Sequence, residues 1–266
     1  MSHSLAAPDF YAYSQPFDDL EFLIYMSALA NYRTEPMGTW YDKVKTRYTN
    51  SVYALLSDYL PPNAKVLEVG PGHGHFARQI RDAGLEYDAV EPSDYFRQAL
   101  NEQGFQVTEE PVPPILRNSE VYDLLYASMV IENLPSSREA GEFASEAARV
   151  LKKGGIMCLV FPNYLTWGRF FFDEHYTHSF ETTPRRIMHL LASQGFEIVR
   201  IEHTLGWFWA EGSLVRNILR HAVNIGMWFM HTAAVRWTFE YLGFGELHWK
   251  IRKTLFEAVV VVARKK

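Results

Sequence analysis

The sequence predicts an α/β fold with a doubly wound, mostly parallel sheet. Between residues 61 and 204, short apolar runs of strand length alternate with segments of helical periodicity. That alternation is typical of a parallel sheet covered by helices on both faces. A glycine-rich turn also follows the first apolar run and leads directly into a helical pattern, which is the arrangement that places a ligand at a helix N-terminus.

Seven apolar segments are the expected strands, and their order along the chain sets the frame for everything else. They comprise residues 65–69, 86–90, 105–108, 122–127, 156–161, 196–204 and 256–263. Helices are expected between them at residues 76–83, 93–103, 137–151 and 183–193. Their limits are marked by serine N-caps and by glycines at the C-terminal ends: the caps are Ser93 and either Ser136 or Ser137, and the glycines are Gly84, Gly104, Gly154 and Gly195.

Two further zones flank this core. Residues 1–60 form an aromatic N-terminal helical cap, with apolar residues at helical spacing over 20–28 and 44–59. Residues 205–254 hold five of the seven tryptophans and are too long for a structureless loop, so we expect a helical insertion. The predicted organisation is therefore a cap at 1–60, a core at 61–204, the insertion at 205–254 and the last strand of the core at 255–266.

Composition limits the class of protein. The net charge of -5 and the pI near 6.1 argue against a protein that holds nucleic acid through many phosphate contacts, so we expect no nucleic-acid partner. The single cysteine, Cys158, cannot form an intramolecular disulfide, and residues 1–10 lack a secretory signal pattern. No run of about 18 uncharged apolar residues is present to cross a bilayer. We expect a cytoplasmic location.

The glycine-rich turn is the first candidate site. Residues 68–74 read Glu-Val-Gly-Pro-Gly-His-Gly, and Glu91 ends the next strand 21 residues after Gly70, where it is placed to accept hydrogen bonds from the ribose hydroxyls of an adenosine. A nicotinamide dehydrogenase is the main rival, but its fingerprint requires a glycine at position 75, where this chain has His75. The alternative without a ligand is an ordinary turn followed by a solvated strand end.

Four motifs in the correct order resemble those of the class I S-adenosylmethionine-dependent methyltransferases. Residues 66–74 resemble the first motif of that family, and Glu91 falls on its ribose-binding acid. Residues 122–134 resemble the fourth-strand motif, and residues 150–155 the turn into the fifth strand. The resemblance implies an enzyme with S-adenosyl-L-methionine as cofactor, on a Rossmann-like seven-stranded sheet whose last strand is antiparallel.

The resemblance also implies roles for single residues. The sulfonium of the cofactor would lie between the glycine loop and Ser128 and Met129, with Glu68 orienting the loop and Glu91 holding the ribose. Glu109, or Glu110 beside it, is the candidate for the adenine amine. The complete set of expected cofactor-binding residues is Glu68, Gly70, Pro71, Gly72, Gly74, Glu91, Pro92, Ser93, Glu109, Ser128 and Met129.

The candidates for acceptor binding and catalysis are His178 and His175, in a segment after the fifth strand where this fold usually presents acceptor-binding groups. An imidazole suits removal of a hydroxyl proton near neutral pH. A structural cap and a metal site are the alternatives for these histidines, and we assign no metal. Many similar small-molecule enzymes carry a histidine where this chain has Asn133, so a base at that position is not assumed.

The function expected from this is methyl transfer to a small-molecule acceptor, with a hydroxyl of a sugar, quinone or natural product favoured. Carbon or nitrogen methylation by the same fold and a non-catalytic cofactor-binding module remain as alternatives. A protein or RNA methyltransferase is disfavoured by the acidic balance and by the lack of an Asn-Pro-Pro-Tyr type sequence after the fourth strand.

The insertion has three interpretations. Its apolar residues recur as a helical stripe, and we expect this stripe to pack on the protein as a lid that walls the acceptor pocket. A homodimer interface and a helix lying on a membrane surface are the alternatives, the latter because basic residues stand beside Trp207, Trp209, Trp228 and Trp237. The stripe comprises Leu214, Val215, Ile218, Leu219, Ala222, Ile225, Gly226, Phe229, Met230, Ala233 and Trp237, opposite Arg216, Asn217, Arg220, His221 and Asn224.

Overall fold

A computed structural model describes residues 39–110, 112–205 and 214–266. It contains one seven-stranded sheet with the order β3-β2-β1-β4-β5-β7-β6. All neighbours pair in parallel except β7, which is antiparallel to β5 and β6. The predicted fold class is therefore confirmed. The strands are β1 Lys65–Val69, β2 Glu86–Val90, β3 Val107–Thr108, β4 Tyr122–Ser128, β5 Leu151–Pro162, β6 Phe196–Leu205 and β7 Glu257–Lys265.

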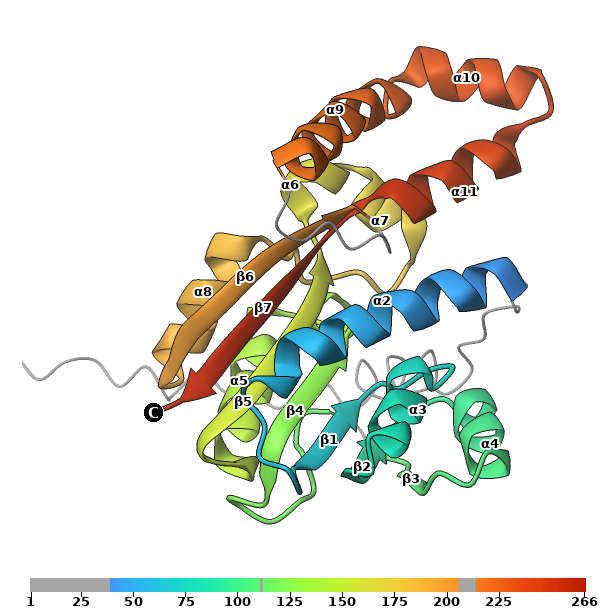
Figure 1. The fold of residues 1–266 in the computed structure, drawn as a ribbon. Helices are drawn as coiled ribbons and strands as arrows, with labels where there is room; N and C mark the ends of the chain where they lie inside the picture. Colours follow the sequence, from blue (N-terminus) through green and yellow to red (C-terminus); the bar gives the residue numbers. More distant parts are fainter. Residues whose placement is uncertain (1–38, 111, 206–213) are drawn as a thin grey trace, which may run out of the picture.

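Helices cover both faces of the sheet (Figure 1). One face carries α2 and α3, and the other carries α5 and α8, because alternate residues of each strand point to opposite faces. On β1, for example, Val66 joins the core with α2 and α3, whereas Leu67 joins the core with α5 and α8. The helices are α2 Thr39–Ser57, α3 His75–Asp82, α4 Asp94–Glu102, α5 Ser137–Val150 and α8 Pro184–Ser193.

The helix starts follow the expected capping chemistry. Ser93 accepts a hydrogen bond from the Phe96 N–H and begins α4, and Ser136, rather than Ser137, caps α5 by accepting from the Arg138 N–H. Helix α2 confirms the helical pattern predicted over 44–59, although the helix itself ends at Ser57. The pattern predicted at 20–28 and residues 206–213 of the insertion, which include Trp207 and Trp209, lie outside the described residues.

Strand β3 is shorter than the predicted 105–108. The Phe105 N–H donates to the carbonyl of Leu100, so this residue closes the end of α4 instead of pairing in the sheet. Its side chain is buried with Leu100 and Ala77, beneath α3 and α4. The apolar character of residue 105 therefore reflects helix packing rather than a strand.

The insertion is helical, as predicted, but it contacts the core differently. It contains α9 Leu214–Met230, α10 Ala233–Tyr241 and α11 Gly245–Leu255, which project from one end of the sheet beside α6 Tyr164–Trp167 and α7 Phe170–Glu174 (Figure 1). The buried residue of α9 is Met227, with Val223 and Met230 partly buried beside it. Of the predicted stripe, Met230 packs on the protein, whereas Ile218, Ile225, Phe229 and Trp237 are exposed, so the stripe as a whole does not face the core.

Candidate active site

A cavity of about 380 Å³ lies where β1, β2 and β4 end. Parallel strands present their carboxyl ends at one edge of a sheet, and that edge is the usual ligand site of open α/β folds. The volume falls within the range of small-molecule sites. Residues from the glycine loop line one end, and residues from the loop after α7 line the other.

The glycine loop is shaped by three positive φ angles, which are +70° at Gly70, +51° at Gly72 and +72° at Gly74. An added Cβ at Gly70 would lie 2.8 Å from Val130 Cγ2, and one at Gly74 would lie 2.5 Å from Leu100 Cδ2. At Gly72 an added Cβ would meet no atom within 4 Å. Gly70 and Gly74 therefore permit close packing behind the loop, whereas Gly72 borders open space at the cavity.

Glu91 ties the end of β2 to this loop. Its carboxylate accepts hydrogen bonds from the Gly72 N–H and the Ser93 N–H, both at 3.0 Å. The side chain is buried, and burial raises the pKa of Glu91. Each carboxylate oxygen has a second lone pair, so the same group can still accept from a ligand hydroxyl at the cavity wall.

Glu68 lies beneath the loop at the end of β1. The Tyr87 hydroxyl donates to its Oε2 at 2.6 Å. Burial raises the pKa of Glu68 to about 8, an effect that the Tyr87 hydrogen bond partly offsets. Glu68 is therefore mostly protonated at neutral pH, and it lines the cavity as a hydrogen-bonding group without a full negative charge.

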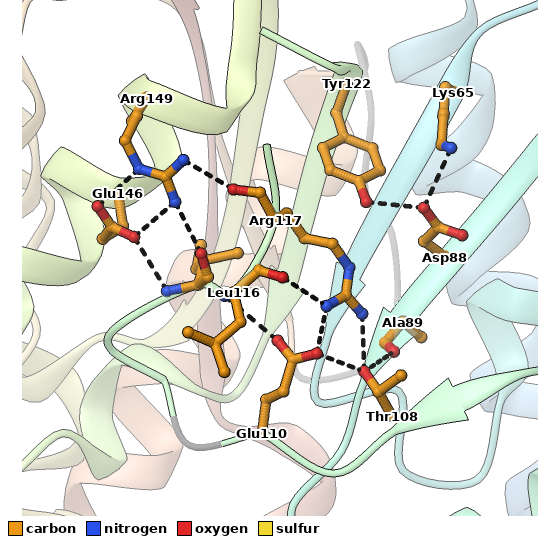
Figure 2. Close-up of polar contacts among 11 residues, drawn as sticks. Lys65, Asp88, Ala89, Thr108, Glu110, Leu116, Arg117, Tyr122, Glu146 and Arg149 are labelled. Atoms are coloured by element: carbon orange, nitrogen blue, oxygen red, sulfur yellow. Dashed lines mark hydrogen bonds and ion pairs between the residues drawn. The ribbon is translucent and has the colours of Figure 1, made fainter. Parts of the chain in front are cut away.

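The two acidic residues after β3 have different surroundings. Glu110 is buried, lines the cavity, pairs with Arg117 and accepts from the Thr108 hydroxyl at 2.8 Å (Figure 2). The Glu109 side chain is 65% exposed and pairs with Arg97 at 2.8 Å, outside the cavity. Of the two candidates for the adenine amine, the structure thus brings Glu110 to the site and leaves Glu109 on the surface.

Arg149 holds in place the chain segment that contains Arg117. Its guanidinium donates to the carbonyls of Ile115 and Arg117, each at 2.7 Å, while its partner Glu146 accepts from the Ile115 N–H at 3.1 Å (Figure 2). This bidentate arrangement fixes the loop from the α5 side. The Arg117–Glu110 pair is consequently positioned by contacts outside the cavity.

The opposite end of the cavity is organised by Asn133, the last residue of the short 3₁₀ helix η2 Ile131–Asn133. Its Nδ2 donates to the Met129 carbonyl at 3.0 Å, and its Oδ1 accepts from the Thr177 hydroxyl at 2.5 Å. Met129 has a φ of +57°, which is uncommon for a residue with a side chain. Asn133 therefore links the end of β4 to the loop that carries the two histidines.

The same contacts assign the tautomer of His175. The Thr177 hydroxyl uses its hydrogen on Asn133, so the 2.6 Å contact between Thr177 Oγ1 and His175 Nδ1 requires a hydrogen on Nδ1. The Thr177 N–H also lies 3.3 Å from Nδ1, which would need the other tautomer, but this contact is longer. In neutral His175 the lone pair is therefore on Nε2.

His178 is held in the same tautomer by a different group. Its Nδ1 donates to the Phe171 carbonyl at 2.5 Å, and its Nε2 lies 3.7 Å from Glu174 Oε2. The imidazole is 7% exposed and packs at 4.8 Å from the Phe171 ring. Both histidines line the cavity, and both have Nε2 as the nitrogen that can accept a proton.

Glu132 is the residue that sequence reasoning missed. It is fully buried, lines the cavity and has neither carboxylate oxygen hydrogen-bonded to any other described residue. Burial raises the pKa of Glu132 to about 8, an effect that its own backbone N–H partly offsets; the charge of Glu174 raises the pKa further, and Lys45 lowers it. Its backbone carbonyl accepts from the Ser179 and Phe180 N–H groups at 2.9 and 3.1 Å, which fixes the loop against η2. A glutamate beside Asn133 gives no sequence signal of burial.

The structure brings both histidines and eight of the expected cofactor residues to one cavity: Glu68, Gly70, Pro71, Gly72, Glu91, Pro92, Ser128 and Met129. Gly74, Ser93 and Glu109 do not line it; the first two support the loop and α4. Among the described residues, no three His, Cys, Asp or Glu side chains are grouped so that they would hold a metal ion.

Residues 41–201 match a family model described as a methyltransferase domain, so the chain belongs to that family. A probable S-adenosylmethionine-dependent methyltransferase of Mycolicibacterium smegmatis is 30% identical over 60% of this chain and 61% of its own length. An uncharacterized methyltransferase of Mycobacteroides abscessus is 34% identical over 38% of the chain and 40% of its own length. The chain thus matches less than two thirds of either relative.

Solved structures share the fold. A putative sarcosine dimethylglycine methyltransferase from Galdieria sulphuraria superposes with a TM-score of 0.57 over 92% of this chain and 97% of its own, at 16% identity. Identity that low speaks for the fold alone. Family and architecture together confirm the predicted resemblance to the S-adenosylmethionine-dependent methyltransferases.

Proposed function

We propose that this protein transfers the methyl group of S-adenosylmethionine to a hydroxyl of a small-molecule acceptor. The observation that carries the acceptor chemistry is the group formed by Glu132, His175 and His178 on one wall of the cavity. All three offer atoms that can receive a proton, and they face the same space as Ser128 and Met129. A hydroxyl needs such a partner, because it becomes a better nucleophile as its proton leaves.

The residues at the other end suit the cofactor. Gly72 leaves open space at the cavity edge, and the buried Glu91 carboxylate retains lone pairs for two ribose hydroxyls. Glu110, held by Arg117, is the candidate for the adenine amine, and Glu68 supports the glycine loop. When bound, S-adenosylmethionine supplies a methyl group activated by a positively charged sulfur, so the chain's own task is alignment and proton removal.

The groups that can accept the proton come from two elements, the loop after α7 and the helix η2. Hydrogen bonds at Nδ1 orient the Nε2 atoms of His178 and His175. The backbone carbonyl of Glu132 accepts hydrogen bonds from the loop that carries them, which fixes the position of Glu132. Burial raises the pKa of Glu132 to about 8, so only a minor ionised fraction is present at neutral pH, and it is this strongly basic form that accepts the proton. The buried, apolar surroundings of Trp167 and Phe256 keep bulk water away from that transfer.

The alternative reactions differ in how much proton removal they require from Glu132 and the two histidines. Carbon methylation of an activated ring and nitrogen methylation of a neutral amine need less proton removal, so replacing Glu132 would affect them less. Asn133 stands where many similar small-molecule enzymes carry a histidine, and the lack of that base would favour a non-catalytic module. Asn133 instead has a positioning duty toward Thr177, so its identity does not argue for loss of transfer.

The test is incubation with methyl-labelled S-adenosylmethionine and a panel of phenols, sugars, amines and activated carbon acids. We expect label in one or more hydroxyl compounds, with turnover reduced in His178→Ala and His175→Ala while cofactor affinity is retained. Cofactor binding without label in any acceptor would favour the non-catalytic module. Label only in amines or carbon acids would overturn the hydroxyl assignment.

A further inference from the structure

The α9–α11 insertion presents an unusual surface. Nine of the thirteen large apolar side chains that are exposed in the described part of the chain lie between residues 218 and 247. They are Ile218, Ile225, Trp228, Phe229, Trp237, Tyr241, Leu242, Phe244 and Leu247, and we call them the exposed apolar set. Large apolar side chains that gather in this number on the exposed faces of one insertion indicate an interaction site.

Helix α9 packs on the protein through one face and exposes apolar side chains on the other. Val223, Met227 and Met230 face the core, where Met227 is buried with Trp167 and Phe256. At about 100° per residue, Ile218, Ile225 and Phe229 lie about half a turn from Met227. The exposed fractions of these three side chains are 61%, 62% and 55%. One face of α9 is therefore used by the protein, and the other is apolar and unpartnered within the described residues.

The exposed apolar set contains the aromatic residues that are typical of helices lying at a membrane interface. The side chains of Trp228, Trp237 and Tyr241 are 66%, 64% and 76% exposed. The rings of Trp237 and Tyr241 stack on one side of α10, with their centroids 5.4 Å apart. Tryptophan and tyrosine combine an apolar ring with a polar atom, which places them at the level of lipid headgroups. A protein–protein interface also uses aromatic residues, so charge is needed to choose between the two.

The charge of the insertion favours a membrane surface over a second copy of the protein. Residues 214–255 contain six lysines and arginines and two glutamates, a formal charge of +4 in a chain whose net charge is -5. Arg252 is buried over the Phe170 ring and does not contribute to the surface charge, so the remaining residues carry a formal excess of +3. Two copies of this surface would bring like charges together, which disfavours self-association. An anionic lipid surface attracts basic residues by about 1 kcal/mol each. No helix of the described residues is long and apolar enough to span a bilayer.

We propose that α9–α11 docks on an anionic membrane surface, with the exposed apolar set inserted at headgroup depth. The inner side of the insertion packs on Trp167 and Phe256, two residues that line the cavity. Docking would therefore hold the acceptor end of the cavity close to the lipid. The inference does not depend on the chemistry of the acceptor, and it concerns a surface separate from the cofactor residues.

Vesicle co-sedimentation of the full chain tests this inference. We expect binding to phosphatidylcholine vesicles containing phosphatidylglycerol, weaker binding to pure phosphatidylcholine, and loss of binding at high salt. Trp237→Ser with Tyr241→Ser should weaken binding about tenfold or more, which corresponds to about 1.4 kcal/mol. Arg236→Glu with Lys250→Glu, which removes the formal excess charge, should weaken binding to anionic vesicles specifically.

Leu116→Ser is the matched control, because Leu116 is 62% exposed but lies at the Glu110 network, far from the insertion in sequence. It should leave vesicle binding unchanged. Far-UV circular dichroism checks that each variant is folded, and affinity for S-adenosylhomocysteine checks the cofactor end independently. Absence of binding to anionic vesicles, or equal binding by the aromatic variant, would overturn the proposal. So would a concentration-dependent dimer in ultracentrifugation that the aromatic variant abolishes.

Discussion

The Thr177 hydroxyl donates to Asn133 Oδ1 at 2.5 Å, which joins the histidine-bearing loop to the end of β4. The same asparagine holds the Met129 carbonyl, so one amide fixes both the strand end and the loop. Because His175 is oriented through Thr177, the position of its imidazole depends on this contact as well.

Thr177→Val should therefore lower acceptor turnover about fivefold while cofactor affinity stays close to wild type, since an oriented hydrogen bond contributes about 1 kcal/mol. Thr177→Ser retains the hydroxyl and should restore most of the activity. Steady-state kinetics on the acceptor and calorimetry on the cofactor separate the two effects. A Val variant with normal turnover would show that the loop is positioned without this contact.

The cofactor end has its own prediction. Gly72→Ala places a methyl group at the cavity edge on a residue with φ of +51°, and Glu91→Ala removes the acceptor of two backbone N–H groups. Each variant should bind S-adenosylhomocysteine at least about tenfold more weakly, measured by calorimetry. Wild-type affinity in both would place the cofactor elsewhere.

The paired acids after β3 provide an internal control for that assignment. Glu110→Gln removes a charge at the cavity wall and should weaken cofactor binding several-fold. Glu109→Gln alters a side chain that is 65% exposed outside the cavity, so affinity should be unchanged. The opposite order of effects would show that the adenine amine faces Glu109 instead.

Burial of Glu132 also predicts a pH dependence of stability. Its pKa is raised from 4.5 to about 8, so between these values the folded state keeps a proton that the unfolded chain loses. This contribution makes the free energy of unfolding fall as pH rises from about 4.5 to about 8, and the loss is complete above that. In Glu132→Gln the contribution is absent.

Urea unfolding of Glu132→Gln and wild type from pH 5 to pH 8 measures the difference, which should shift in favour of the variant by up to about 1.4 kcal/mol per pH unit. Comparison with wild type cancels the other titrating groups, including Glu68 and the lowered pKa of His75. Glu146→Gln is the control without a pH slope in this range: the hydrogen bond from Arg149 lowers the pKa of Glu146, so this carboxylate is ionised in both states from pH 5 to pH 8 and its contribution is lost only at lower pH. A pH-independent difference for Glu132→Gln would mean that the carboxyl is not buried unpartnered.

Much of the cofactor end could be predicted because its signals are local. The glycine spacing and Glu91 at a strand end are readable from neighbouring residues, and the structure brings them to one cavity. The sequence could not distinguish Glu109 from Glu110 as the cavity residue, because adjacent residues of an extended chain point to opposite sides. Glu132 was missed because its burial depends on packing by the loop after α7, which is distant in sequence.

The insertion shows a different limit of sequence reasoning. Periodicity identified α9 as a helix, and that prediction is confirmed. Apolar residues occupy both faces of this helix, so periodicity alone did not tell which face meets the core. The stripe that looked like the core side is exposed at Ile218, Ile225 and Phe229, and Met227 on the other side is buried.

The central claim is that one cavity holds the cofactor at the glycine loop and removes an acceptor proton at Glu132 and the two histidines. Its most direct test is Glu132→Gln, assayed for acceptor kcat/KM and for S-adenosylhomocysteine affinity in the same preparation. We predict that kcat/KM falls about 100-fold, within the range of general base catalysis, while affinity changes less than about twofold. Unchanged kcat/KM, or an equal loss of affinity and turnover, would contradict the claim.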